Sequence, residues 1–164
     1  MDGYRPEAWH DLAVASVGAS AALTGLLFVA VSINLNRILQ YAWLPRRAAV
    51  TLILLLALLA TGLFVLIPGQ PLPALAGELA GTGIVLAVPA TFELVRGPTG
   101  EDTKPYWRIV PAILLYLPAL TLFTTAATLL AGTGGGLYWL PAVLVGGTAG
   151  ACWNAWVLLV EIQR

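Results

Sequence analysis

The chain has 164 residues, of which 59% are hydrophobic and 10% are charged, and its eight basic residues balance its eight acidic ones. Soluble domains carry about 25% charged residues, so this composition excludes an ordinary soluble domain and predicts a single domain embedded in lipid. Zero net charge excludes a general attraction to nucleic acid, and a single cysteine excludes a disulfide or a cysteine metal site within the chain.

The N-terminal residues predict a retained first span rather than a cleaved signal peptide. Before the first apolar stretch, Asp2, Glu7 and Asp11 outweigh Arg5, which is the reverse of the basic start of a signal peptide. The stretch that follows is also longer than the roughly 7–15 apolar residues of a signal peptide. We therefore expect this stretch to remain in the protein as its first membrane helix.

Five apolar stretches are long enough to cross a bilayer as helices. A bilayer core about 30 Å thick needs about 20 apolar residues in a helix. Turn-forming residues separate the stretches, as at 68–73, 97–100 and 132–136. The short links predict antiparallel neighbours in one transmembrane domain that covers residues 1–164. The expected spans are about residues 12–35, 48–67, 74–95, 109–131 and 137–162.

Basic residues predict the orientation of these spans. The links after the second and fourth spans contain no lysine or arginine, whereas all basic residues except Arg5 lie in the links after the first and third spans or at the C-terminal end. Cytoplasmic loops of membrane proteins carry an excess of lysine and arginine. We therefore expect an all-α bundle in the cell (inner) membrane, with the N-terminus outside and the C-terminus in the cytoplasm.

Four spans gather their polar and small residues on one helical face, at about 100° per residue. Two interpretations are open: such faces pack helices through close approach and hydrogen bonds, or they line a hydrated path. The second span lacks such a face, and we expect it to face lipid. The candidates for helix packing are Gly77, Gly81, Gly146 and Gly150. The candidates for lining a pore or binding a ligand are Asn34, Glu93, Thr121, Thr125, Asn154 and Glu161.

The ionisable and amide side chains within the spans lie towards the helix ends. Glu93 lies one turn before Arg96, a spacing that allows an ion pair, and Glu161 lies within reach of the basic links. The alternative for these glutamates is a charged ring at a pore mouth. Asn34 and Asn154 are expected to hydrogen-bond to each other. The alternative is that both join Glu93 and Glu161 in a ligand or ion site.

No pattern in the sequence predicts an enzyme, a metal site or a cofactor. The one histidine, His10, could join Asp11 and Glu78 at the outer surface as an acid–base or metal site. Metal sites usually have three or four ligands at regular spacing, and this grouping has no such spacing. We therefore expect neither catalysis nor a bound metal.

Two non-enzymatic functions fit these observations. The first is a homo-oligomeric membrane protein that acts as a passive channel for ions or small solutes, because weakly polar threonine and glycine faces lie between charged ends. The alternative is an accessory or regulatory subunit that binds another membrane protein through its Gly-, Ser- and Thr-lined faces. The expected partners are the lipid bilayer, further copies of the chain, and a second membrane protein, without nucleic acid.

Overall fold

The structure, a computed structural model, describes residues 2–40, 44–96 and 106–163, with the side chains at 96, 106–108 and 161–163 left undescribed. The described residues form helices and contain no strand. The helices are α1 (His10–Ile33), α2 (Leu35–Ile38), α3 (Leu44–Val65), α4 (Leu72–Arg96), α5 (Tyr106–Ala131) and α6 (Leu140–Gln163). Three short 3-10 helices, η1 (Asp2–Tyr4), η2 (Pro6–Trp9) and η3 (Gly136–Trp139), lie before α1 and α6.

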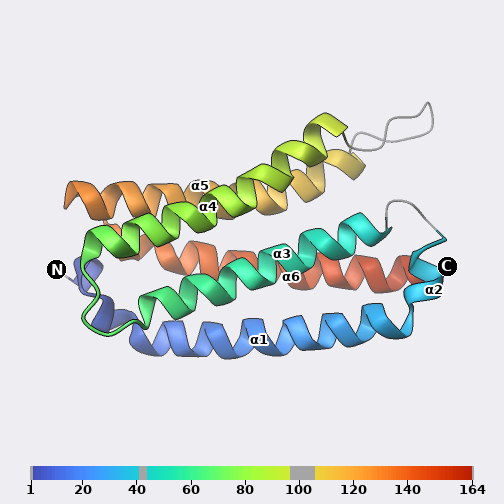
Figure 1. The fold of residues 1–164 in the computed structure, drawn as a ribbon, viewed down its shortest axis with the longest axis horizontal. Coiled ribbons are helices and arrows are strands. Elements are labelled where there is room, and N and C mark those ends of the chain that lie inside the picture. Colours follow the sequence, from blue (N-terminus) through green and yellow to red (C-terminus); the bar gives the residue numbers. More distant parts are fainter. Residues whose placement is uncertain (1, 41–43, 97–105, 164) are drawn as a thin grey trace.

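Five of these helices are long and apolar enough to cross a membrane, which confirms the prediction of a five-helix membrane bundle. Successive long helices run in opposite directions, so that the two termini lie at opposite ends of the bundle (Figure 1). We call the end with α2 and the start of α3 the arginine end, because it holds Arg37, Arg46 and Arg47. The other end, with η1 and residues 132–136, is the glycine end.

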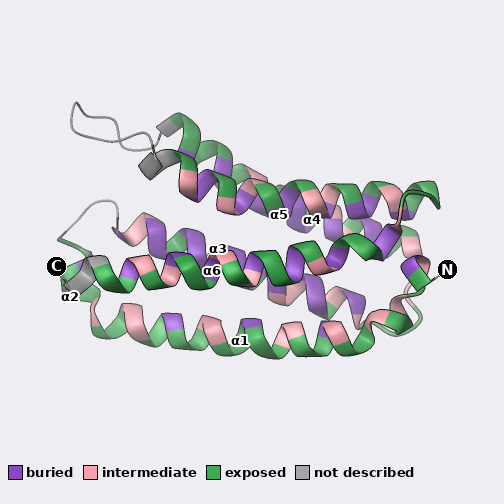
Figure 2. Ribbon diagram, turned by 180° about the vertical axis from the view of Figure 1, so that it is seen from behind, coloured by how far each residue is buried: buried purple, intermediate pink, exposed green. Residues whose placement is uncertain are grey.

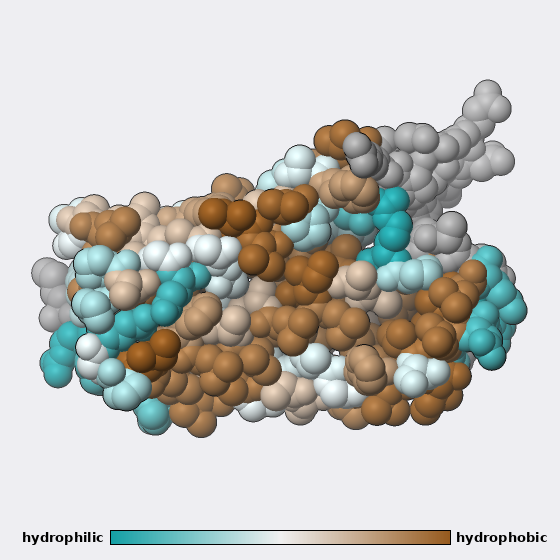
Figure 3. All heavy atoms as spheres, in the orientation of Figure 1, coloured by the Kyte–Doolittle hydropathy of each residue, from teal (hydrophilic) through white to brown (hydrophobic). Residues whose placement is uncertain are grey.

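Apolar side chains cover the flank of the bundle between hydrophilic groups near its two ends (Figure 3). Such a flank suits contact with lipid, because the hydrocarbon core offers no partner to polar groups. The protein is therefore a multi-pass membrane protein by the length and composition of its helices.

The central helix of the bundle is α3, which packs against α1, α4 and α6. In its most apolar segment 56% of the residues are buried, compared with 11% in the first span. The expectation that the second span faces lipid is therefore wrong. A helix that is apolar on all sides suits a protein interior as well as it suits lipid, so composition alone does not separate the two positions.

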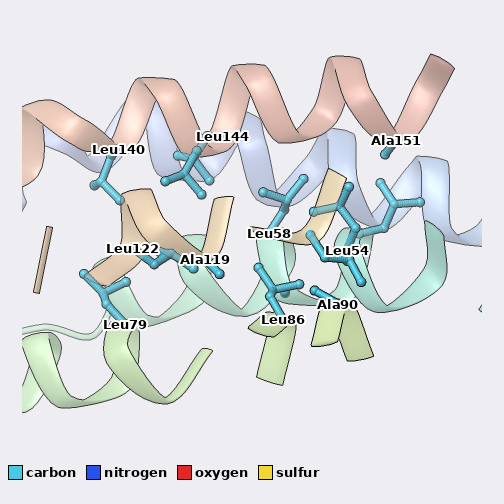
Figure 4. Packing of buried hydrophobic residues seen from close by; sticks show 14 of the residues in the cluster. Leu54, Leu58, Leu79, Leu86, Ala90, Ala119, Leu122, Leu140, Leu144 and Ala151 are labelled. Atoms are coloured by element: carbon cyan, nitrogen blue, oxygen red, sulfur yellow. The ribbon is translucent and has the colours of Figure 1, made fainter. Parts of the chain in front are cut away.

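Leucine side chains fill the centre of the bundle (Figure 4). Leu54 and Leu58 of α3 belong to the same core as Leu86 of α4 and Leu144 of α6, all of them almost completely buried. Buried threonines within these helices donate hydrogen bonds to backbone carbonyls of their own helix, as the Thr61 hydroxyl does to the Ala57 oxygen at 2.8 Å. A hydrated path along the centre of one protomer would have to displace these leucines.

Candidate functional site

Three polar side chains form a buried cluster at the arginine end, where α3 meets α6. The Nε of Arg47 donates to Oδ1 of Asn154 at 2.7 Å, and Nδ2 of Asn154 donates to Oγ1 of Thr51 at 2.6 Å. The Thr51 hydroxyl in turn donates to the backbone oxygen of Arg47 at 3.0 Å. The exposed fractions of Arg47, Thr51 and Asn154 are 8%, 0% and 1%. The hydrogen bonds within the cluster therefore replace those that these side chains would make with water.

The spacing of the cluster follows from helix geometry. Arg47 and Thr51 are four residues apart and lie on the same face of α3, so one amide on α6 can reach both. An arginine within a membrane span is costly unless its guanidinium is paired. Asn154 supplies an acceptor to Arg47 and a donor to Thr51, which joins the second and fifth membrane helices at this end.

The preceding residue, Arg46, makes an ion pair with the neighbouring helix α4. Its Nη2 lies 3.1 Å and its Nε 3.2 Å from Oε1 of Glu93, and the guanidinium carbon lies 5.7 Å from the centre of the Phe92 ring. Adjacent helical residues point about 100° apart, which directs Arg46 towards α4 and Arg47 towards α6. Two consecutive arginines thus connect α3 to two different helices.

The structure shows which groups Glu93 and Asn34 contact. Glu93 pairs with Arg46 across the α3–α4 interface, whereas the side chain of Arg96 lies outside the described residues. The expected bond between Asn34 and Asn154 is wrong, because Nδ2 of Asn34 donates to a backbone oxygen of its own chain segment, that of Ala30, at 2.9 Å. Interhelical pairing depends on which helices are neighbours, and helical spacing within one span does not show this.

The remaining candidates for a polar path do not converge in one protomer. Thr121 and Thr125 donate to the backbone oxygens of Leu117 and Thr121, each at 2.8 Å. Thr125 is fully buried while Thr121 lies towards the outside of the bundle, so the face expected to hold both is divided. The side chain of Glu161 lies outside the described residues.

Of the four glycines predicted to pack helices, only Gly150 comes close to another helix among the described residues. For Gly77, Gly81 and Gly146, no described atom of another helix lies within 4 Å of an added Cβ, while at Gly150 the Leu114 side chain lies at 2.8 Å. A packing role for Gly77, Gly81 and Gly146 would need a helix from another chain, and this role stays a prediction. The glycines that meet other helices most closely within the chain are Gly62 against Val17, Gly147 against Leu58 and Gly150 against Leu114, and Gly83 follows against Phe123 at 3.1 Å. Gly83 and Gly147 precede Ala87 and Ala151 by four residues, a small-xxx-small spacing that could have indicated them.

At the glycine end, the N-terminal segment packs on the link between α5 and α6. The backbone N–H of Gly135 donates to the Tyr4 hydroxyl at 3.2 Å, and the rings of Trp9 and Tyr138 meet edge to face with centres 5.2 Å apart. Gly134, Gly135 and Gly136 all have positive φ, which side-chain-bearing residues rarely adopt. A hollow of about 390 Å³ lies between this link and Gly3, Tyr4 and Tyr138.

The grouping of His10, Asp11 and Glu78 does not form a metal site. Oε2 of Glu78 accepts a 2.6 Å hydrogen bond from the Gln70 amide. Among the described residues no three histidine, cysteine, aspartate or glutamate side chains come together in a way that could hold a metal ion.

Comparison with known proteins gives no relative: no protein-family model, curated protein or solved structure matches this chain. The function of the protein is therefore inferred from its own geometry. The buried Arg47–Thr51–Asn154 cluster connects α3 to α6 and so has a structural role.

Proposed function

We propose that the protein is a non-enzymatic, homo-oligomeric membrane protein that self-associates through the outward face of α1. The observation that carries this proposal is a face of small, exposed residues on α1, the membrane helix with the smallest share of buried residues. In the proposed arrangement the protein lies in the cell (inner) membrane, with its N-terminus outside and its C-terminus in the cytoplasm.

The inner face of α1 is defined by its buried residues, Ala13, Ser20 and Leu27, which recur every seven positions and face α3. Most other residues of α1 are exposed along its length (Figure 2). At about 100° per residue, the opposite face is centred roughly 180° away. That face carries Ala15, Gly18, Ala22 and Gly25, all exposed.

Small residues on an exposed membrane helix favour contact with another helix. Lipid tails are as apolar as leucine, so a face that meets only lipid gains nothing from glycine, whereas glycine and alanine let two backbones approach closely. Gly18 and Gly25 have no described atom of another helix within 4 Å of an added Cβ, so space for such an approach is present. Copies of the chain would then be related by closed symmetry about an axis along the membrane normal.

The proposed orientation is supported by the position of the basic residues. Arg37, Arg46 and Arg47 lie together at the arginine end, and an excess of arginine indicates the cytoplasmic side. Because Cys152 is the only cysteine, a Cys152→Ser background allows single cysteines to be placed at Gln70 and Arg37. In intact cells a membrane-impermeant maleimide should label the cysteine at 70 and spare the one at 37, and the reverse pattern would invert the topology.

A passive channel is the second candidate, and in this case its path would lie between protomers. The observation that favours it is a set of outward hydroxyls on α4 and α5, with Thr91 bonded to Tyr116 at 2.7 Å and Thr124 exposed. An accessory role, in which the face of α1 binds another membrane protein, uses the same small residues. The three roles differ in what occupies the face of α1 and in whether ions cross.

The test of the proposal measures association in lipid. Energy transfer between donor- and acceptor-labelled copies is followed in liposomes as the protein-to-lipid ratio is varied. We expect the Gly18→Leu, Gly25→Leu double variant to weaken association about tenfold, since interhelical contacts in membranes contribute on the order of 1 kcal/mol. The matched control Ala21→Leu is exposed on α1 but lies outside this face, and it should associate like the natural chain.

A wild-type chain that stays monomeric at every protein-to-lipid ratio would overturn self-association. If the monomer instead co-purifies with a second membrane protein in a manner that depends on Gly18 and Gly25, the accessory role replaces it. Fluorescence-reported flux of K⁺, Cl⁻ and H⁺ in the same liposomes separates the channel from both other roles.

A further inference from the structure

An apolar groove lies between α1 and α6 in the half of the bundle nearer the arginine end. Its volume is about 260 Å³, and its walls include Leu26 and Ala30 of α1 and Cys152, Trp156 and Leu159 of α6, with Leu55 of α3 among the lining residues. We propose that this groove binds one acyl chain of an anionic phospholipid, with the lipid phosphate beside Arg37.

The groove exists because α1 and α6 both pack on α3 and make fewer contacts with each other. The exposed fraction of Leu55 is 2%, so this residue closes the groove from inside. An empty space of this kind forfeits the dispersion contacts of its lining, and its apolar walls offer water too few hydrogen-bond partners. A hydrocarbon occupant restores those contacts.

The size of the groove suits a hydrocarbon chain. A cavity of about 150 Å³ lined by leucine, isoleucine and phenylalanine accepts benzene, so about 260 Å³ accommodates several methylene groups. An acyl chain can therefore lie along the groove.

The charge at the arginine end of the bundle selects the headgroup. The side chain of Arg37 in α2 is exposed and makes no hydrogen bond or ion pair with any described residue, whereas Arg46 and Arg47 are engaged with α4 and α6. Arg37 lies in α2, four residues after the end of α1, and so beyond the α1 wall of the groove in the chain. Figure 1 shows α2 at the same end of the bundle as the C-terminal end of α6, the helix that forms the other wall. A basic residue at this level attracts anionic lipid.

The experiment is native mass spectrometry of the full chain, released from mild detergent after incubation with equal amounts of phosphatidylglycerol and phosphatidylcholine. We expect the natural chain to retain one phosphatidylglycerol per protomer. Arg37→Gln should lower the preference for phosphatidylglycerol over phosphatidylcholine about fivefold, the effect of one basic residue near an anionic lipid. Ala30→Phe, which fills the groove, should remove the bound lipid of either kind.

The matched control is Ala21→Phe, which adds the same ring to an exposed position of α1 outside the groove and should retain the lipid. Cys152→Phe fills the groove from α6 and repeats the test if Ala30→Phe does not fold. Equal retention of the two lipids, or retention of phosphatidylglycerol by both groove variants, would overturn the proposal. The proposal would also be overturned if the groove variants retained their lipid but no longer formed oligomers. That result would indicate that a second copy of the chain occupies the groove. A protein that is monomeric can still retain the lipid, so this test is independent of self-association.

Discussion

A 2.7 Å hydrogen bond joins Nε of Arg47 to Oδ1 of Asn154, two residues 107 positions apart in the chain. The bond crosses the interface of α3 and α6 where both are buried, and the same amide donates to Thr51 at 2.6 Å. Because Arg46 binds Glu93 on α4, the first turn of α3 holds two neighbouring helices through successive side chains. This end of the bundle is therefore held by polar contacts, while leucine packing holds the centre.

Asn154→Ala should lower the free energy of unfolding by about 2 kcal/mol, because it leaves buried polar groups of Arg47 and Thr51 without their amide partner. Thermal unfolding in detergent micelles, followed by circular dichroism, measures the change. Asn34→Ala is the control and should cost far less, since the side chain of Asn34 bonds only to the backbone oxygen of Ala30 among the described residues. Equal losses in the two variants would contradict a special role for the buried cluster.

Arg46→Gln should cost only ~0.5 kcal/mol, because 33% of the Arg46 side chain is exposed and solvent weakens its pair with Glu93. The difference from the natural chain should shrink in 1 M salt, where the Debye length is about 3 Å. Unfolding midpoints at low and high salt test both statements. A loss that matches Asn154→Ala and does not respond to salt would show that the pair is effectively buried.

Gly62→Val should destabilise the bundle by about 1–3 kcal/mol through overpacking, because a Cβ there lies 2.6 Å from the Val17 side chain and 3.3 Å from the Ala13 oxygen. Gly81→Val introduces the same side chain on α4 with no described atom of another helix within 4 Å. Comparison of unfolding midpoints for the two variants in detergent checks the prediction. If Gly81→Val proved the more damaging, α1 would not pack on α3 as described.

Gly3→Ala should release the N-terminal segment from the glycine end. A Cβ at this position lies against the backbone oxygen of Gly135 and 2.8 Å from the Tyr138 ring, and the backbone oxygen cannot move away as a side chain can. Hydrogen exchange measured by mass spectrometry should show faster exchange in residues 2–9. Gly18→Ala, placed in open space on α1, should leave that exchange unchanged.

If the protein conducts ions between protomers, Thr121→Val together with Thr124→Val should reduce the flux into liposomes at least severalfold. The exchange removes two hydroxyls that lie towards the outside of α5 with little change in side-chain volume. Thr125→Val is the control, because Thr125 is fully buried within the protomer. A greater loss of flux with Thr125→Val would place the path inside one chain.

The five membrane helices could be predicted because the length of an apolar stretch and the turn residues between stretches are local properties of the sequence. The identity of the neighbours could not. Glu93 makes an ion pair, as expected, but its partner Arg46 lies 47 residues away on α3. Pairing with Arg96, three positions further along α4, stays a prediction. Asn154 was recognised as a polar residue that needs a partner, but the partner turned out to be Arg47 and not Asn34.

Five antiparallel helices long and apolar enough to cross a membrane follow from local features of the sequence, since a helix satisfies the backbone of an apolar stretch within itself. The central position of α3, the peripheral position of α1 and the identity of the glycines that touch another helix emerge only when the five helices pack together. They do not follow from the sequence because lipid and a leucine core present nearly the same apolar surroundings to a side chain. The pattern along one helix therefore shows where polar groups gather, and the packing of five helices decides what each group meets.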